Sequence, residues 1–536
     1  MMLDPGSTRI GVRLADIPLD RDDWRHSFGW PVPFALLFEL SHRLQRRFFE
    51  LLRSLEGDER DVMTLARPLA DTAIVMETAV ALQAERASGL RLEGPPELAV
   101  LRGDTLVDEL EESSLVDMGA AKLTTEIPYQ TLRRLARTLS WTPLTRLPVT
   151  LAAPQALAVT HNPLLIAEAR RRRVRLWFHH AAPLLDQITQ GVSEGFLLDG
   201  PEQINTLAEH ALRSLIDDQT LTDEMCERVV ALMRPVYVGK LAQASHTLGV
   251  LRRVKQLPNA LWSGTGGLVP VRALGIEVRR RGGTVTRFDH GGTMSLLAEP
   301  YPMVNSELSV TSEFVLPSAT AARQSVIMQA ADLARPFGLS SVVGGRGDPG
   351  LDPGANSTRS MKQRPLVLFV GTAYYGYSQT YPPLTPAPIY LEWQYRILEM
   401  LGALPIELIH KPHPGGLYRG HPPGMDHLAR VDHRLFEQAM IDADCLVFDL
   451  AASTTFSIAL SSDRRIVLLD FGSLRFSEES WPLIEARCRI VPVIADNRNR
   501  ATVDAEALKE AVCAPKPMPD PAPLRSLFLA DGEFDC

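Results

Sequence analysis

The chain lacks the features that mark several large classes of protein. It carries 56 Lys and Arg against 64 Asp and Glu, a net charge of −8, so it has no basic excess of the kind that nucleic-acid-binding proteins show. Its five cysteines are scattered without CxxC spacing, which argues against a disulfide framework or a zinc site. No apolar run approaches the roughly 20 residues that span a bilayer, and the N-terminus resembles no secretory signal. We therefore expect a cytoplasmic protein with reduced thiols and no nucleic-acid partner.

Several catalytic signatures are also missing. The sequence contains no HExxH zinc motif, no GxSxG nucleophile elbow and no protein-kinase set. It also lacks a pair of carboxylates at a strand end of the DxD kind, which would hold a metal ion. We therefore expect metal-independent chemistry without a bound cofactor.

The length and one low-complexity segment predict at least two domains. A chain of 536 residues exceeds one ordinary core. Residues 344–364, GGRGDPGLDPGANSTRSMKQR, combine glycine, proline and small polar residues without apolar periodicity, which is typical of a linker. We therefore predict an N-terminal domain at 1–343, a flexible linker at 344–364 and a C-terminal domain at 365–536.

Both domains show strands alternating with helices. In the C-terminal part we predict strands at 364–371, 406–410, 444–450 and 465–472, with helices at 389–404, at 433–443 and from 454. In the N-terminal part we predict a strand at 260–264, a helix at 268–282 and a strand at 284–292, after helical stretches at 60–90 and 200–256. This alternation is typical of doubly wound parallel sheets. The predicted fold is therefore α/β, with two facing Rossmann-like halves, a helix-rich N-terminal extension and the site between the halves.

Two basic segments could contact a membrane. The stretch from residue 31 is predicted to form an amphipathic helix. Its apolar side consists of Leu40, Leu44, Phe48, Leu51 and Leu52. Its basic side either docks on the chain's own domain or touches a membrane surface. The run Arg170–Arg173 is either a solvated helix face or a site for an anionic acceptor or lipid headgroups. Peripheral contact with the cytoplasmic face of the inner membrane therefore stays open.

The strand at 406–410 ends in HKPHPGG, which places Lys411 and His413 at its carboxyl end. Ligands bind beyond the carboxyl ends of strands in open α/β sheets, and the flanking prolines restrict the backbone there. A fixed histidine can donate a hydrogen bond to a phosphate oxygen. The pattern predicts a phosphate site, with a rigid surface turn as the alternative.

The next strand of this half ends in DLAASTT, which places Ser453, Thr454 and Thr455 before a helical run. One of them is expected to cap the helix, and the helix N-terminus with its hydroxyls is an anion site or simply a cap. Gly371 ends the first strand of this half and is expected to border the donor. In the loop YYGYSQTY that follows, Tyr374 either stacks on a base or sugar or packs within the loop.

In the other half, the strand at 284–292 ends in DHGG. Asp289 and His290 stand at its end, and the two glycines allow close approach to the backbone. A neutral histidine is the commonest general base near neutral pH. We expect His290 to accept a proton from an acceptor hydroxyl, unless it is an ordinary turn histidine. WSGTGG at 262–267 either cradles a phosphate or makes a tight turn.

HKPHP followed by DLAASTT resembles the HP and Ser/Thr motifs of bacterial GT-B transferases that build surface carbohydrates such as capsule and lipopolysaccharide. These include capsule Kdo transferases, bacterial sialyltransferases and teichoic-acid glycerophosphotransferases. TRFDHGG resembles their His-Gly motif, and YLEWQ resembles a later helix; the likeness covers roughly residues 258–475. The resemblance implies that His413, Ser453 and Thr454 hold the donor's phosphates.

The resemblance leaves two choices for the base. In the glycerophosphotransferases it is the His of the His-Gly motif, which is His290 in this chain. In the sialyltransferases it is a carboxylate of the N-terminal domain, for which this chain offers four candidates: Asp289, Glu299, Glu307 and Glu313.

The sequence therefore predicts an inverting, metal-independent glycosyltransferase. It would move a hexose, sialic acid or Kdo-type sugar from a CMP-, CDP- or UDP-linked donor to a glycan or lipid-linked acceptor. One alternative is an enzyme like the nucleotide-sugar 2-epimerases, which place acid/base carboxylates between two Rossmann halves. Another is a catalytically inactive GT-B scaffold in a glycan assembly complex.

Overall fold

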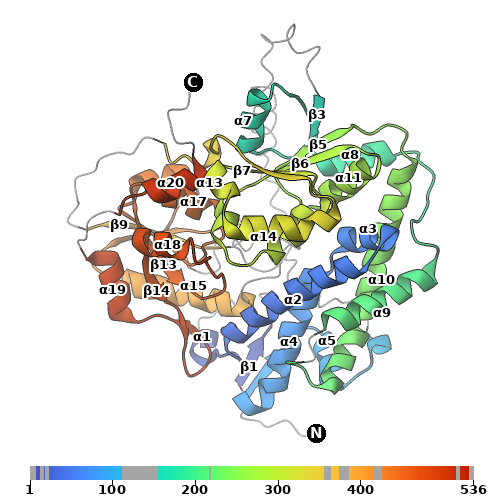
Figure 1. Cartoon of the computed structure of the whole chain (residues 1–536). Helices are drawn as coiled ribbons and strands as arrows, with labels where there is room; N and C mark the ends of the chain where they lie inside the picture. Colours follow the sequence, from blue (N-terminus) through green and yellow to red (C-terminus); the bar gives the residue numbers. More distant parts are fainter. Residues whose placement is uncertain are drawn as a thin grey trace.

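The computed structural model describes residues 8–12, 17, 23–110, 155–216, 219–354, 364–372, 386–413, 425–514 and 519–529. These residues form two large sheets, one in each half of the chain, with helices around them (Figure 1). Strand runs such as LVLFV at 366–370 are buried along their whole length, as strands covered by helices on both faces must be.

The N-terminal sheet is parallel, in the order β4-β3-β5-β6-β7-β8. Its strands are β3 Gln155–Ala158, β4 Arg175–Phe178, β5 Ala260–Ser263, β6 Thr284–Phe288, β7 Glu313–Leu316 and β8 Ser341–Gly344. Its helices are α7 Pro163–Arg171, α8 Ala181–Thr189, α11 Val269–Arg280, α12 Tyr301–Ser306, α13 Ala319–Ala322 and α14 Ser325–Ala334. The strand order changes direction between β3 and β5, which is where such sheets bind ligands.

The C-terminal sheet is also parallel, in the order β11-β10-β9-β12-β13-β14. Its strands are β9 Leu366–Val370, β10 Glu407–Lys411, β11 Arg430–Val431, β12 Cys445–Phe448, β13 Arg465–Asp470 and β14 Arg489–Pro492. Its helices are α15 Ala387–Gly402, α16 Phe436–Ala439, α17 Thr454–Ser461, α18 Trp481–Arg487, α19 Ala505–Cys513 and α20 Ala522–Phe528. This is the Rossmann strand order, with its switch point between β9 and β12.

The predicted α/β class is therefore confirmed, with two Rossmann-like sheets and a helix-rich N-terminal extension. One predicted helix is wrong in length, because 433–443 forms only the single turn α16 and a 3-10 turn at Met440–Asp442. Residues 155–178, for which no strand was predicted from the sequence, form the unit β3, α7 and β4.

The extension forms a bundle against α11 and α12. Its helices are α1 Asp23–Ser27, α2 Phe34–Ser54, α3 Gly57–Ala66, α4 Leu69–Ser88, α5 Glu97–Arg102, α9 Pro201–Leu215 and α10 Asp223–Arg253. A two-stranded parallel ribbon, β1 Thr8–Gly11 and β2 Leu90–Glu93, lies beside α4. A short antiparallel pair, β15 Ile494–Ala495 and β16 Ala501–Thr502, lies against α15.

Helix α2 joins the two halves. Its predicted apolar side is buried from Leu40 to Leu52, which confirms the amphipathic pattern. The first turn, however, enters the core of the C-terminal half, where the Phe34 ring lies 5.5 Å from that of Phe471. Figure 1 shows α2 running from α1, near α15, toward α3. The N-terminal extension therefore belongs to both halves.

The beginning of the predicted linker is packed. Asp348 is 3% exposed, and its N–H donates to the Phe528 carbonyl at the end of α20. Its carboxylate accepts the N–H of Gly350 at 2.8 Å and starts the 3-10 turn η8 Pro349–Leu351. Residues 344–354 thus form ordered contacts, because Asp-Pro-Gly here specifies a turn. Residues 355–363 lie outside the described residues, and the division into domains stays a prediction.

No helix in the described part of the chain is long and apolar enough to cross a membrane.

Candidate active site where the two sheets meet

The His-Gly turn after β6 and the Ser/Thr turn before α17 lie against each other. Ser457 Oγ donates a hydrogen bond to the carbonyl of Gly291, 166 residues away. A Cβ placed on Gly291 would lie 3.2 Å from Thr454 Oγ1. In Figure 1, α17 lies beside α20 and α13, where the two halves join. The structure therefore brings together two motifs that the sequence separates by more than 160 residues.

Both glycines of the His-Gly turn have backbone conformations that favour glycine, with φ of +107° at Gly291 and +75° at Gly292. A Cβ on Gly292 would also lie 2.8 Å from a ring carbon of Phe528 and 2.9 Å from a methyl carbon of Leu351. The glycine pair is thus required by the close contact between the halves, whatever chemistry occurs beside it.

His290 is exposed at this junction, whereas the neighbouring Asp289 is buried. The carboxylate of Asp289 accepts a hydrogen bond from the N–H of Gly292 at 2.9 Å. The carbonyl of Asp289 accepts a hydrogen bond from Nδ2 of Asn162, which is the N-cap of α7. Burial raises the pKa of Asp289 to about 6 against the opposing effect of His290. The predicted catalytic pair is therefore an exposed imidazole beside a carboxyl that binds its proton unusually tightly.

A third residue of this junction was not identified from the sequence. Asp348 precedes η8, which contacts both α7 and α17. Burial raises its pKa to about 7, and the charge of Asp289 adds to the effect. The sequence offered only the Asp-Pro-Gly turn as a signal, inside a segment whose composition resembles a linker.

The other candidate carboxylates are engaged elsewhere. Glu313 forms an ion pair with Arg172 at 2.6 Å, and Glu299 lies 3.8 Å from Arg475. Glu307 is buried and accepts the N–H of Gly266 in the glycine-rich turn. Among the four carboxylates named from the sequence, Asp289 is therefore the one at the His-Gly turn.

The glycine-rich turn after β5 uses its own N–H groups. That of Gly264 donates to Thr160 Oγ1 at 2.5 Å, and that of Gly267 donates to Thr265 Oγ1 at 3.1 Å. Together with the bond from Gly266 to Glu307, this favours a tight turn over a phosphate cradle.

At the C-terminal sheet, Ser453 is the N-cap of α17. Its hydroxyl accepts the N–H of Phe456 at 3.2 Å and lies 2.9 Å from Thr455 Oγ1. Thr454 is exposed at the first turn, next to Gly291. The cap is thus as expected, and the exposed hydroxyl of Thr454 and the helix N-terminus face the junction.

Lys411 ends β10 and His413 follows it; β10 is two strands from β12, so the ends of these two strands lie about 10 Å apart. Gly371, at the end of β9, lies between the two groups. Burial and the charge of Lys411 lower the pKa of His413 to about 4, so the imidazole is neutral at physiological pH. Burial also lowers the pKa of Lys411. A neutral imidazole carries no charge to offset that of a phosphate, but it still donates one hydrogen bond.

Beneath Gly371 lies a buried polar network. Tyr390 Oη donates to Asp449 at 2.8 Å and accepts the N–H of Thr372 at 2.6 Å, and Trp393 Nε1 donates to the same carboxylate at 3.2 Å. A Cβ on Gly371 would lie 2.7 Å from Nε2 of Gln394. Burial raises the pKa of Asp449 to about 7.

This network was not predicted as part of the site, although its helix carries the YLEWQ sequence. The YLEWQ side chains hold Asp449 at the end of β12 and the backbone that follows β9. Tyr374 lies outside the described residues.

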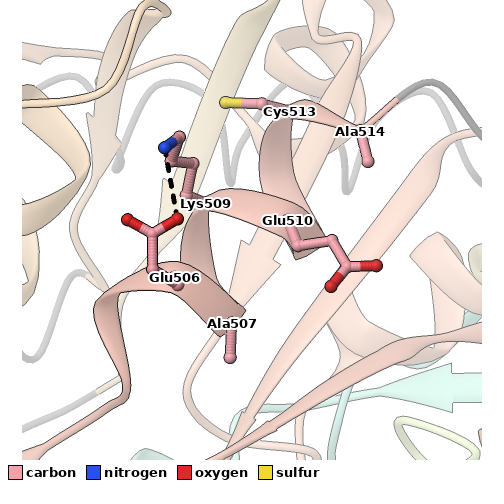
Figure 2. Close-up of a pocket in the computed structure, with 6 residues that line it drawn as sticks. All are labelled: Glu506, Ala507, Lys509, Glu510, Cys513 and Ala514. Carbon is pink, nitrogen blue, oxygen red and sulfur yellow. Dashed lines mark hydrogen bonds and ion pairs between the residues drawn. The ribbon is translucent and has the colours of Figure 1, made fainter.

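A depression of about 500 Å³ on α19 is lined by Glu506, Ala507, Lys509, Glu510, Cys513 and Ala514 and contains no predicted site residue (Figure 2). Within the described ranges, no group of three or more His, Cys, Asp or Glu side chains is arranged to hold a metal ion.

Comparisons with known proteins gave a coarse structural likeness. No protein-family model and no curated protein matches the chain. Among solved structures, it is similar to the Streptomyces sp. SF2575 glycosyltransferase SsfS6 complexed with thymidine diphosphate, at 13% identity and a TM-score of 0.27. A second structure of SsfS6 gives 10% identity and a TM-score of 0.25. Each alignment covers 63% of this chain and 87% of the other.

Proposed function

We propose that the chain is a metal-independent glycosyltransferase that uses a CMP-, CDP- or UDP-linked sugar. The observation that carries the proposal is the contact of the Gly291 turn with Thr454 and Ser457. It sets the exposed His290 of one sheet beside the helix N-terminus of the other. A transferase needs such a junction, because the acceptor and the activated donor must meet there.

The donor's phosphates would lie along the carboxyl edge of the C-terminal sheet. The α17 N-terminus with Thr454 would bind one end of a diphosphate, and Lys411 and His413 the other. The ends of β10 and β12 lie about 10 Å apart, with Gly371 at the end of β9 between them, which suits a ligand that crosses the ends of the three strands. The nearby phosphate would favour a positive charge on Lys411 and His413, offsetting the burial that lowers their pKa values.

His290 would take the proton of the acceptor hydroxyl as that oxygen attacks the sugar carbon. Attack from the face opposite the nucleotide would invert the configuration. Asp289 would orient the turn that carries His290 and stabilise the imidazolium that forms. Surface glycans of the capsule or lipopolysaccharide kind are the acceptor class that the resemblance favours.

One observation favours the alternative of an epimerase-like enzyme. Asp289 and Asp348 are buried carboxyls with raised pKa values where the two halves meet. Such carboxyls suit acid/base work on a nucleotide sugar without an acceptor. Turnover of a nucleotide sugar alone would distinguish this reaction from transfer.

The test is nucleotide binding by thermal shift in EDTA with CMP, CDP, UDP, GDP and ADP. A ligand at one hundred times its Kd should stabilise the folded protein by about 2.7 kcal/mol. His413→Ala should lose this stabilisation, whereas the control His427→Ala, at an exposed histidine of the same half, should keep it. If no nucleotide stabilises the wild type, the proposal is wrong.

A further inference from the structure

A basic and aromatic edge on the N-terminal sheet has no role in the proposed reaction. Although the whole chain has a net charge of −8, residues 170–175 contain five arginines. The buried Glu168 pairs with Arg171 at 2.5 Å and with Arg172 at 2.9 Å, and Arg172 also pairs with Glu313. These two arginines are therefore structural.

The other three arginines of this run are available to a ligand. The guanidinium groups of Arg170, Arg173 and Arg175 form no ion pair or hydrogen bond with the described part of the chain. Arg170 and Arg173 are exposed, and Arg175 is half-buried. The edge thus carries three positive charges that no described carboxylate neutralises.

Two large aromatic side chains follow these charges in the sequence, on opposite faces of the edge strand. Trp177 is 68% exposed and Phe178 is 38% exposed, both on β4. β4 is the edge strand of its sheet and pairs only with β3 within the described residues. Exposed tryptophan beside arginine is the composition that favours the interface of a bilayer, where the ring enters the headgroup region and the guanidinium binds phosphate.

The helix that the sequence also suggested for membrane contact is less suitable. On α2, Arg46 pairs with Glu50, Arg43 donates to Thr220 and Arg47 donates to the Ile216 carbonyl. These arginines are engaged within the protein. The edge strand therefore offers the better surface.

The position of the edge fits an acceptor held at a membrane. All strands of the N-terminal sheet are parallel, so Phe178 ends its strand at the same side of the sheet as Asp289. The net negative charge of the chain would repel an anionic bilayer from other directions. Binding through this edge would thus fix which side of the molecule faces the lipid.

We propose that the edge formed by Arg170, Arg173, Arg175, Trp177 and Phe178 binds the surface of an anionic bilayer. The proposal does not depend on the nucleotide site. If the proposed transferase reaction is correct, the edge also favours a lipid-linked acceptor over a soluble one.

The test is co-sedimentation of the full chain with vesicles of phosphatidylcholine containing 30% or no phosphatidylglycerol, in low salt, without nucleotide. We expect binding only to the anionic vesicles, and weaker binding in 0.5 M NaCl because salt screens the charges. Replacing Arg170, Arg173 and Arg175 with Gln should weaken partitioning by about tenfold or more. Trp177→Ala with Phe178→Ala should weaken it by about tenfold as well.

Matched controls keep the test independent of net charge and folding. Arg323, Arg335 and Lys509 replaced with Gln remove the same charge elsewhere, and Ile494→Ala removes an exposed apolar side chain from the C-terminal half. Both controls should bind like the wild type. The arginine variant changes two exposed groups and one half-buried group without a described ion pair, so it tests the proposal even if the aromatic variant misfolds. Equal binding by the arginine variant, or no binding by the wild type, would overturn the proposal. It would also be overturned if dextran sulfate displaced the wild type and the Trp177/Phe178 variant from the vesicles equally well.

Discussion

Burial shifts the pKa values of opposite kinds of ionisable group at the edges where the two sheets meet. The N-terminal edge holds acids, Asp289 and Asp348, whose pKa values burial raises to about 6 and about 7. The C-terminal edge holds bases, and burial lowers the pKa values of His410 and His413 to about 4. Below the C-terminal edge, Asp449 is a carboxyl with a pKa of about 7. The difference is consistent with proton transfer at the N-terminal edge and with binding of an anionic ligand at the C-terminal edge.

The largest expected effect comes from separating the two edges. Gly292→Ala should cost about 3 kcal/mol of unfolding free energy, because its φ is +75° and its Cβ would meet Phe528 and Leu351. Gly282→Ala is the matched control, since its φ is +78° but its Cβ would meet nothing within 4 Å. It should cost about 1 kcal/mol. Equal losses in chemical denaturation would show that the contact between the halves contributes little.

A smaller, pH-dependent effect is expected at the buried carboxyls. The pKa of Asp348 in the folded protein, about 7, lies above its ordinary value of 3.8. The folded state therefore binds this proton more tightly than the unfolded state. Its contribution to stability is fully present below about pH 4 and is lost as the pH rises to about 7.

Asp348→Asn removes this dependence. The variant should gain on the order of 2.5 kcal/mol relative to the wild type between pH 5 and pH 8. Asp449→Asn should behave in the same way, since its pKa is also about 7. Urea denaturation at both pH values checks this, and a wild type whose stability rises with pH relative to both variants would contradict it.

The smallest effect is expected on α19, away from either edge. Lys509→Ala breaks its ion pair with Glu506 at 3.2 Å, and both side chains are exposed. It should change stability by less than about 0.5 kcal/mol. It should also leave nucleotide stabilisation unchanged. Loss of that stabilisation would move the nucleotide site from the C-terminal edge to the depression on α19.

The strands and their terminal motifs were predictable, because a buried parallel strand reads as an apolar run and its ligand residues follow directly. RPLVLFVG and DCLVFDL each became a strand of the sheet. Asp348 was not predictable, because the composition around it is that of a linker. The role of Asp449 was hidden too, since its partners Tyr390 and Trp393 are 59 and 56 residues away on α15.

The crossing of α2 was hidden for a further physical reason. Apolar periodicity identifies the side of a helix that is buried, but not the core that receives it. Phe34 packs in the C-terminal half, whereas Leu37 packs in the N-terminal half. Phe38 also packs in the C-terminal half, so only the tertiary structure assigns the two sides of one continuous pattern to different cores.

The crossing of α2 also has a consequence for how the protein is made. Phe34 needs Phe471 as a neighbour, and ribosomes add about 5–20 residues per second, so about 20–90 s pass between the synthesis of the two rings. At the other end of the chain, α20 packs on the N-terminal half through the bond from Ser318 Oγ to the Leu527 carbonyl. Each half therefore borrows a segment from the far end of the chain. The N-terminal half therefore cannot finish folding on the ribosome before α20 has been synthesised.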